Sequence, residues 1–200
     1  MNAESADALR AVRRACIIAS AVVLASTIIV VGALTPGYSQ LAETVSRLGS
    51  RGQPHAILAR VGLVLYGVLV VFGAGPLGAR IPAKERLLVG LVGGYGAASV
   101  VTGLAPKDPA YGPHTLTSQI HVGAAIAGGA MLVAAMVLVA RYAPRRRERV
   151  SAATVLGLAL LGIAVFPFLW GTFVYGLVER ALLALAVGWL VTLAVEPAQA

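Results

Sequence analysis

The stretch ACIIASAVVLASTIIVVGAL, residues 15–34, decides the structural class of this chain. It carries no charged side chain. At 1.5 Å per residue, a helix of this length measures about 30 Å, which matches the apolar core of a bilayer. A continuous apolar run of this kind also lacks the alternating polarity of a membrane barrel strand. The stretch therefore predicts a transmembrane helix.

Five further stretches share this length and character. They cover residues 56–75, 87–105, 118–140, 150–170 and 177–195. With 58% hydrophobic residues and a mean hydropathy of +0.86, the chain is far more apolar than a soluble domain of 200 residues. We therefore expect an all-α fold: a polytopic six-helix transmembrane bundle over residues 15–195, with an N-terminal segment (1–14) and a C-terminal tail (196–200).

The basic residues are distributed unevenly among the connections. Eleven of the 16 lysine and arginine residues fall before the first span or in the second and fourth connections. They are Arg10, Arg13, Arg14, Arg80, Lys84, Arg86, Arg141, Arg145, Arg146, Arg147 and Arg149. Short loops rich in Lys and Arg stay on the cytoplasmic side. This predicts an inner-membrane protein with both termini in the cytoplasm.

The net charge of +8 does not indicate a nucleic-acid-binding protein. The basic residues sit between apolar spans, whereas a nucleic-acid-binding face is continuous and interleaved with aromatic side chains. We therefore expect membrane lipids as partners and no nucleic acid. The lone Cys16 excludes an internal disulfide bond.

The first outer connection has a helical period of its own. Leu41, Val45 and Leu48 recur at helical spacing, Ser39 is suited to cap a helix, and Gly49 is suited to end it. These residues predict a short interfacial amphipathic helix in this loop.

The polar residues near this loop are candidates for a binding site. Glu43, Ser46 and Arg47 would share one face of the interfacial helix, either turned toward the bundle mouth or forming a surface ion pair. Arg60 lies about one turn inside the second span, where an unpaired charge is costly. It either extends its charged end to the interface or pairs with an acid of the outer loops.

The second outer connection, GLAPKDPAYGPHTLTSQIH, holds most of the other ionisable groups. Its three prolines stiffen the loop, so we expect a defined position for Asp108. His121 lies in the first turn of the fourth span, where an idle polar group is costly. We predict Asp108 and His121 as the catalytic acid and base of any reaction, although a turn or structural hydrogen bond would also account for them.

A metal site is not expected, since His114 and His121 would lie about 10 Å apart along one helix. The residues point to no particular cofactor. Six side chains of the outer rim remain as ligand-binding candidates. They are Glu43, Ser46, Arg60, His114, Glu179 and Arg180.

Small residues recur within the spans. Gly90 and Gly94 have the spacing that lets two helices approach closely. We interpret them as packing contacts inside one chain, with a homo-oligomer through Gly-rich faces as the alternative.

The order of short motifs resembles one known family. Ser46, Leu48 and Gly49 match a Ser-x-Leu-Gly element after the first helix, and GLAPKDP with His121 matches a Gly-x-x-Pro-x-Asp element followed by a histidine. Gly176 and Arg180 match a Gly-x-x-x-Arg start of the last helix. Ala105 departs from the pattern, since a bulkier residue is usual at this position. The chain therefore resembles the bacterial multi-pass membrane family known as domain-of-unknown-function family 998. The resemblance implies six helices and an outer polar rim, and it supplies no reaction.

Three functions are compatible with this pattern. The first is a membrane enzyme that processes a lipid or isoprenoid-like headgroup at the rim, and the second is a lipid-binding or accessory subunit without chemistry. The third is a small-solute or proton-coupled transporter. The central thirds of the spans lack Asp, Glu, Lys, Arg and His, which disfavours the transporter.

Overall fold

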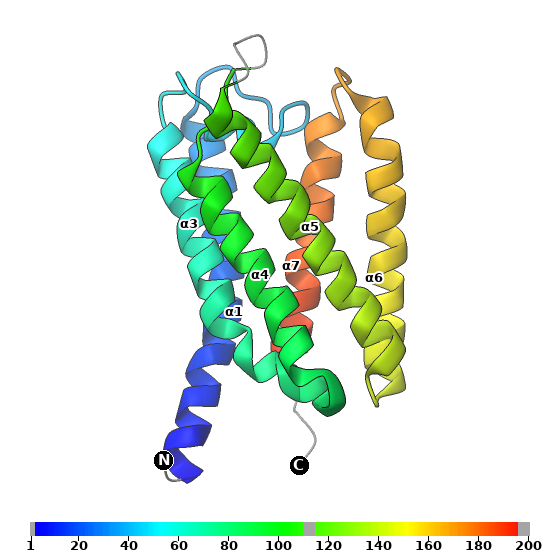
Figure 1. Cartoon of the computed structure of the whole chain (residues 1–200). Coiled ribbons are helices and arrows are strands. Elements are labelled where there is room, and N and C mark those ends of the chain that lie inside the picture. Colours follow the sequence, from blue (N-terminus) through cyan, green and yellow to red (C-terminus); the bar gives the residue numbers. More distant parts are fainter. Residues whose placement is uncertain (1–2, 110–114, 196–200) are drawn as a thin grey trace.

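A computed structural model describes residues 3–109 and 115–195 (Figure 1). Over these residues the fold is all-α, which confirms the predicted six-helix bundle. The six helices that are long and apolar enough to cross a membrane are α1 (Ala3–Leu34), α3 (Ala56–Gly73), α4 (Glu85–Leu104), α5 (Leu116–Tyr142), α6 (Arg146–Val165) and α7 (Tyr175–Val195). The short elements are α2 (Val45–Leu48) and the 3-10 helices η1 (Gly75–Arg80), η2 (Pro82–Lys84) and η3 (Phe166–Leu169).

The helices run up and down, so α1 begins and α7 ends at the same end of the bundle (Figure 1). We call this the terminal end, and we call the opposite end, which carries α2 and the connections before α3, α5 and α7, the loop end. At the terminal end α1 extends beyond its neighbours (Figure 1). The segment 1–14 therefore continues the first helix from Ala3 onward.

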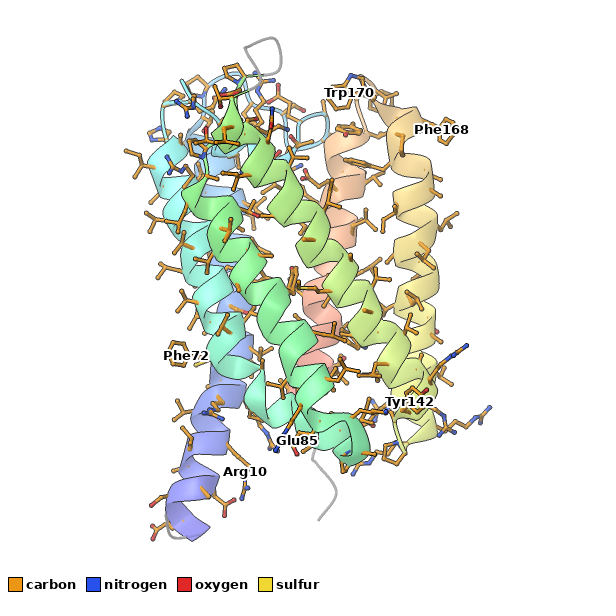
Figure 2. The ribbon with its side chains drawn as sticks, in the orientation of Figure 1. Arg10, Phe72, Glu85, Tyr142, Phe168 and Trp170 are labelled. Atoms are coloured by element: carbon orange, nitrogen blue, oxygen red, sulfur yellow. The ribbon has the colours of Figure 1, made fainter. Side chains whose placement is uncertain are left out.

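Large apolar side chains cover the outside of the bundle. Phe72 on α3, Ile126 on α5 and Leu161 on α6 are all more than 60% exposed. Figure 2 shows Phe72, Phe168 and Trp170 pointing away from the helices. A soluble monomer rarely exposes apolar surface on this scale, whereas lipid tails solvate it readily. The protein is therefore a multi-pass membrane protein.

The core lies between α1, α3, α4, α5 and α7. α3 packs closely against α1 and α4, and α4 also packs against α5. α6 lies outside this group and contacts α5 and α7 (Figure 1). Helices α5 and α7 have few or no close backbone contacts with each other, whereas α6 contacts both.

The close helix approach is not where the glycine spacing placed it. Gly90 has open space beside it, and Gly94 faces only the flexible side chain of Met131. The backbones of α3 and α4 meet instead at Gly67 and Gly96, where each glycine lies against the carbonyl oxygen of the other. The predicted packing inside the chain is therefore wrong for Gly90, and at Gly94 it involves a side chain of α5 and not a close approach of two backbones.

The interfacial helix is shorter than predicted. Only Val45–Leu48 is helical, whereas residues 39–43 form turns. Ser39 Oγ accepts a hydrogen bond from the Ala42 amide at 3.2 Å and closes one of these turns. The Leu41 carbonyl accepts a bond at 2.8 Å from the Leu177 amide, an N–H in the first turn of α7 that has no partner within its own helix. This contact with α7 fixes the segment outside helical geometry.

Candidate functional site

A cavity of about 180 Å³ lies inside the loop-end half of the bundle. α1, α3, α4, α5 and α7 form its walls, and α2 with the following Gly49 covers its loop end. The lining residues are Leu24, Thr27, Ile28, Val45, Ser46, Leu48, Gly49, Ala59, Arg60, Leu63, Tyr66, Tyr95, Ala98, Ser99, Thr102, His121, Ala124, Ala125, Gly128, Glu179 and Leu183. Most of the lining side chains are aliphatic or small, and only a minority are polar.

The hydrogen bonds of His121 fix which of its two ring nitrogens carries the proton. Its Nδ1 atom lies 2.9 Å from the carbonyl oxygens of both Thr102 and Ala105. Because carbonyl oxygens only accept, Nδ1 carries the proton, and in the neutral ring Nε2 is an acceptor. The same bonds satisfy carbonyls at the end of α4, which have no partner within that helix. His121 thus joins α4 to α5 and keeps one nitrogen as a base.

Glu179 contributes a carboxyl group from the first turns of α7. Its Oε2 accepts a 2.6 Å hydrogen bond from the Val45 amide, which joins α7 to α2. Among the described residues, neither the Oε1 atom of Glu179 nor Nε2 of His121 has a hydrogen-bond partner. Neither atom is fully enclosed by protein. Both side chains line the cavity, so two acceptors are available to a ligand there.

Arg180, the next residue on α7, turns away from the cavity and holds the first loop. Its Nε donates to Gln40 Oε1 at 2.9 Å, and its Nη1 donates to the Glu43 carbonyl at 2.8 Å. Its Nη2 donates to the hydroxyl of Tyr38, whose own proton goes to the Thr44 carbonyl at 3.0 Å. Burial raises the pKa of Tyr38, so this phenol stays protonated at neutral pH and keeps donating.

Gly176 allows this loop to lie against α7. A Cβ atom at this position would clash with the Glu43 carbonyl oxygen and would lie 2.7 Å from the Glu43 amide nitrogen. The backbone of the loop therefore requires glycine here. The contact fixes where Glu179 stands relative to α2.

Replacing Gly176 with alanine is expected to lower the thermal unfolding temperature of the detergent-solubilised protein by several degrees, since overpacking against backbone costs about 1 to 3 kcal/mol. Gly188→Ala is the matched control, because Gly188 lies on the same helix with no atom near its missing Cβ. The control should unfold at or slightly above the temperature of the unaltered protein. Equal unfolding temperatures for the two variants would contradict the assigned contact.

The model of the family described as "Protein of unknown function (DUF998)" matches residues 17–196. The chain belongs to the DUF998 family. No curated protein and no solved structure matches it.

The short motifs that carry the family resemblance meet at the loop end of this DUF998 protein. Lys107 of the GLAPKDP element donates from Nζ to Ser46 Oγ at 3.2 Å, which joins it to the Ser-x-Leu-Gly element. The His121 bond to Ala105 joins the same element to α5. Gly176 and Arg180 join the last helix to the first loop. Segments far apart in sequence therefore form one hydrogen-bonded assembly around the cavity.

Asp108, predicted as a catalytic acid, lies outside the cavity lining in the DUF998 structure. Its Oδ2 accepts bonds from the amide and hydroxyl of Thr115 at 2.7 and 2.8 Å, and its Oδ1 lies 3.4 Å from Arg51 Nε. These contacts fix the start of α5. Besides two tyrosines, the ionisable side chains that line the cavity are Arg60, His121 and Glu179, so Glu179 is the carboxylic acid that shares the cavity with the histidine.

The other predicted ligand-binding residues divide into two groups. Ser46 and Arg60 line the cavity. Within residues 3–109 and 115–195, Arg60 pairs with no acid: its Nε and Nη2 donate to the carbonyls of Gly103 and Leu104 at 3.0 and 2.8 Å. Glu43 forms the predicted i,i+4 ion pair with Arg47 outside the cavity lining. His114 lies outside the described residues.

Two tyrosines were missed by the sequence reasoning. The hydroxyls of Tyr66 on α3 and Tyr95 on α4 lie 2.6 Å apart in the cavity wall farthest from α2. A phenol within an apolar span needs a hydrogen-bond partner, because no water is available there. A tyrosine inside each of two predicted spans was therefore a signal in the sequence that the two phenols could bond to each other.

The described residues contain no group of three His, Cys, Asp or Glu side chains placed to hold a metal ion. The side chains that line the cavity offer one carboxyl group, one imidazole with a free nitrogen, one guanidinium group and several hydroxyls.

Proposed function

We propose that this DUF998 protein binds the polar end of a membrane amphiphile in the cavity and that the ligand enters from the side of the bundle. The observation that carries this proposal is the division of the cavity. Arg60, His121 and Glu179 gather toward α2, whereas Leu63 and Leu183 with other small and aliphatic residues form most of the remaining walls, where the two tyrosine hydroxyls are bonded to each other. An amphiphile has the same division into a polar end and an apolar chain.

An opening at membrane depth supports entry from the side. Ala125 lines the cavity, and its own side chain is exposed. It lies about 14 Å along α5 from Leu116, one turn below His121. α5 and α7 have few or no close backbone contacts with each other, and Figure 1 shows their ribbons apart in the loop-end half. At this depth the surroundings of the bundle are lipid.

The size of the cavity limits how much of the ligand it encloses. A volume of 180 Å³ is close to that of an engineered protein cavity of about 150 Å³ that binds benzene. The cavity therefore accommodates a polar end and a few carbon atoms. The rest of the chain would pass between α5 and α7 into the bilayer.

The distribution of basic residues supports entry of the ligand from the side of the membrane that faces away from the cytoplasm. The connections at the loop end contain few basic residues, and those at the terminal end contain many. By the positive-inside rule the loop end faces away from the cytoplasm. The ligand is then a component of the outer leaflet.

The proposal is tested by closing the opening. In the Ala125→Trp variant, a photoreactive dodecyl amphiphile in nanodiscs should label the cavity residues about tenfold less than in the unaltered protein, because the indole fills the passage. Labelled peptides are located by mass spectrometry. Ile126→Trp is the matched control, since Ile126 lies at the same depth of α5, is 68% exposed and does not line the cavity. Equal labelling of the two variants would refute side entry.

A further inference from the structure

The cavity combines groups of opposite character within a small volume. Nε2 of His121 and Oε1 of Glu179 are acceptors that the described residues leave without a partner. Arg60 also lines the cavity, with two of its three nitrogens already bonded to the carbonyls of α4. Its Nη1 remains a donor. Lys107 adds a positive charge beside Ser46, which lines the cavity as well.

This mixture disfavours a charged ligand head of either sign. A phosphate would place its oxygens against the carboxyl group of Glu179 and the lone pair of His121 Nε2. An ammonium group would approach Arg60 and Lys107, which carry the same charge. In a cavity with mainly apolar walls, a like-charge contact of either kind is weakly screened.

A hydroxyl group suits both sets of groups. Its proton donates to one acceptor, and its oxygen accepts from a donor such as Nη1 of Arg60. We infer that the ligand carries an uncharged hydroxyl head, whose proton is accepted by His121 Nε2 and whose oxygen accepts from Nη1 of Arg60, while the carboxyl group of Glu179 disfavours an anionic head. The ligand class is a long-chain or isoprenoid alcohol, or a glycerolipid with a free hydroxyl. This inference rests on the proposed function, because it requires that the cavity receives a ligand.

The test compares heads on one identical chain. Dodecanol, dodecyl phosphate and dodecylamine compete with a photoreactive dodecanol for the full-length protein in nanodiscs. Dodecanol should prevent labelling at a concentration about tenfold lower than either charged compound, because each charged head leaves a buried group unpaired. Farnesol, an isoprenoid alcohol of equal chain length, is compared with dodecanol to identify the type of chain.

Two variants test the roles of His121 and Glu179. In His121→Asn, the side-chain amide occupies the place of Nδ1 and keeps the donor for the Thr102 and Ala105 carbonyls, but it removes Nε2. Its affinity for dodecanol should fall about tenfold while its unfolding temperature stays the same. In Glu179→Gln, an amide replaces the carboxyl group, and competition by dodecyl phosphate should improve. Should His121→Asn unfold, the Glu179→Gln result decides the question alone.

The outcomes separate this inference from the proposed function. Equal competition by all three dodecyl compounds, with labelling still reduced in Ala125→Trp, would overturn the hydroxyl head and leave the cavity proposal standing. Absence of labelling at the cavity residues of the unaltered protein would overturn both. A preference for dodecanol that His121→Asn retains would remove His121 from the binding contacts.

Discussion

Glu148→Gln is expected to destabilise the protein by about 3 to 5 kcal/mol. Glu148 on α6 and Arg80 at the end of η1 form an ion pair at 3.0 Å, and both side chains are only 3% exposed. Arg80 Nη2 also donates to the Leu193 carbonyl on α7. The pair therefore connects α6 and α7 to η1 at the terminal end. Glutamine removes the negative charge that Glu148 provides beside this buried guanidinium, which costs more than the pair itself contributes.

The measurement is chemical unfolding in detergent micelles, followed by circular dichroism. A double variant, Arg80→Met with Glu148→Met, removes both charges and should recover most of the stability lost by Glu148→Gln. Asp7→Asn is the control at an exposed ion pair, because Asp7 and Arg10 are 71% and 57% exposed. Surface pairs of this kind contribute little. A loss of stability in Asp7→Asn as large as that in Glu148→Gln would contradict the prediction that the buried position of the Arg80–Glu148 pair causes the effect.

Gly96→Ala is expected to lower the free energy of unfolding by about 1 to 3 kcal/mol. A Cβ atom on Gly96 would lie 2.8 Å from the Gly67 carbonyl oxygen and 2.9 Å from the Val71 amide nitrogen. Both are backbone atoms of α3, so the two helices would have to separate. Tyr66 and Tyr95 are neighbours of these glycines, and their hydroxyl contact would be disturbed as well.

Gly93→Ala provides the control for this prediction. Gly93 is also on α4, and no atom lies near its missing Cβ. Alanine there should leave the stability unchanged or raise it by up to about 1 kcal/mol, since alanine favours the helix over glycine. The two variants are compared by thermal unfolding in the same detergent. An unfolding temperature for Gly96→Ala that matches Gly93→Ala would show that α3 and α4 tolerate separation at this point.

The candidate site was predicted in part. The sequence singled out Ser46, Arg60, His121 and Glu179, and all four line the cavity. An ionisable residue near the start of an apolar span is costly and needs a partner, which is why these positions were visible from sequence. The sequence could not tell that Asp108 would have its oxygens bonded to Thr115 and Arg51, because those partners depend on how the loop folds onto α5.

What the sequence determined by itself is the membrane character of the chain, its six helices and its division into a basic and a less basic end. Length and hydropathy suffice for this, because a bilayer accepts only helices that satisfy their own backbone and are long enough to cross it. The tertiary structure decided which sides of the helices face one another. A helix that is apolar all round gives no periodic signal for its inner face. Only packing could therefore decide that α3 and α4 approach closely at Gly96 and not at Gly94. Packing likewise placed Glu179 in the cavity and held residues 39–43 in turns against α7.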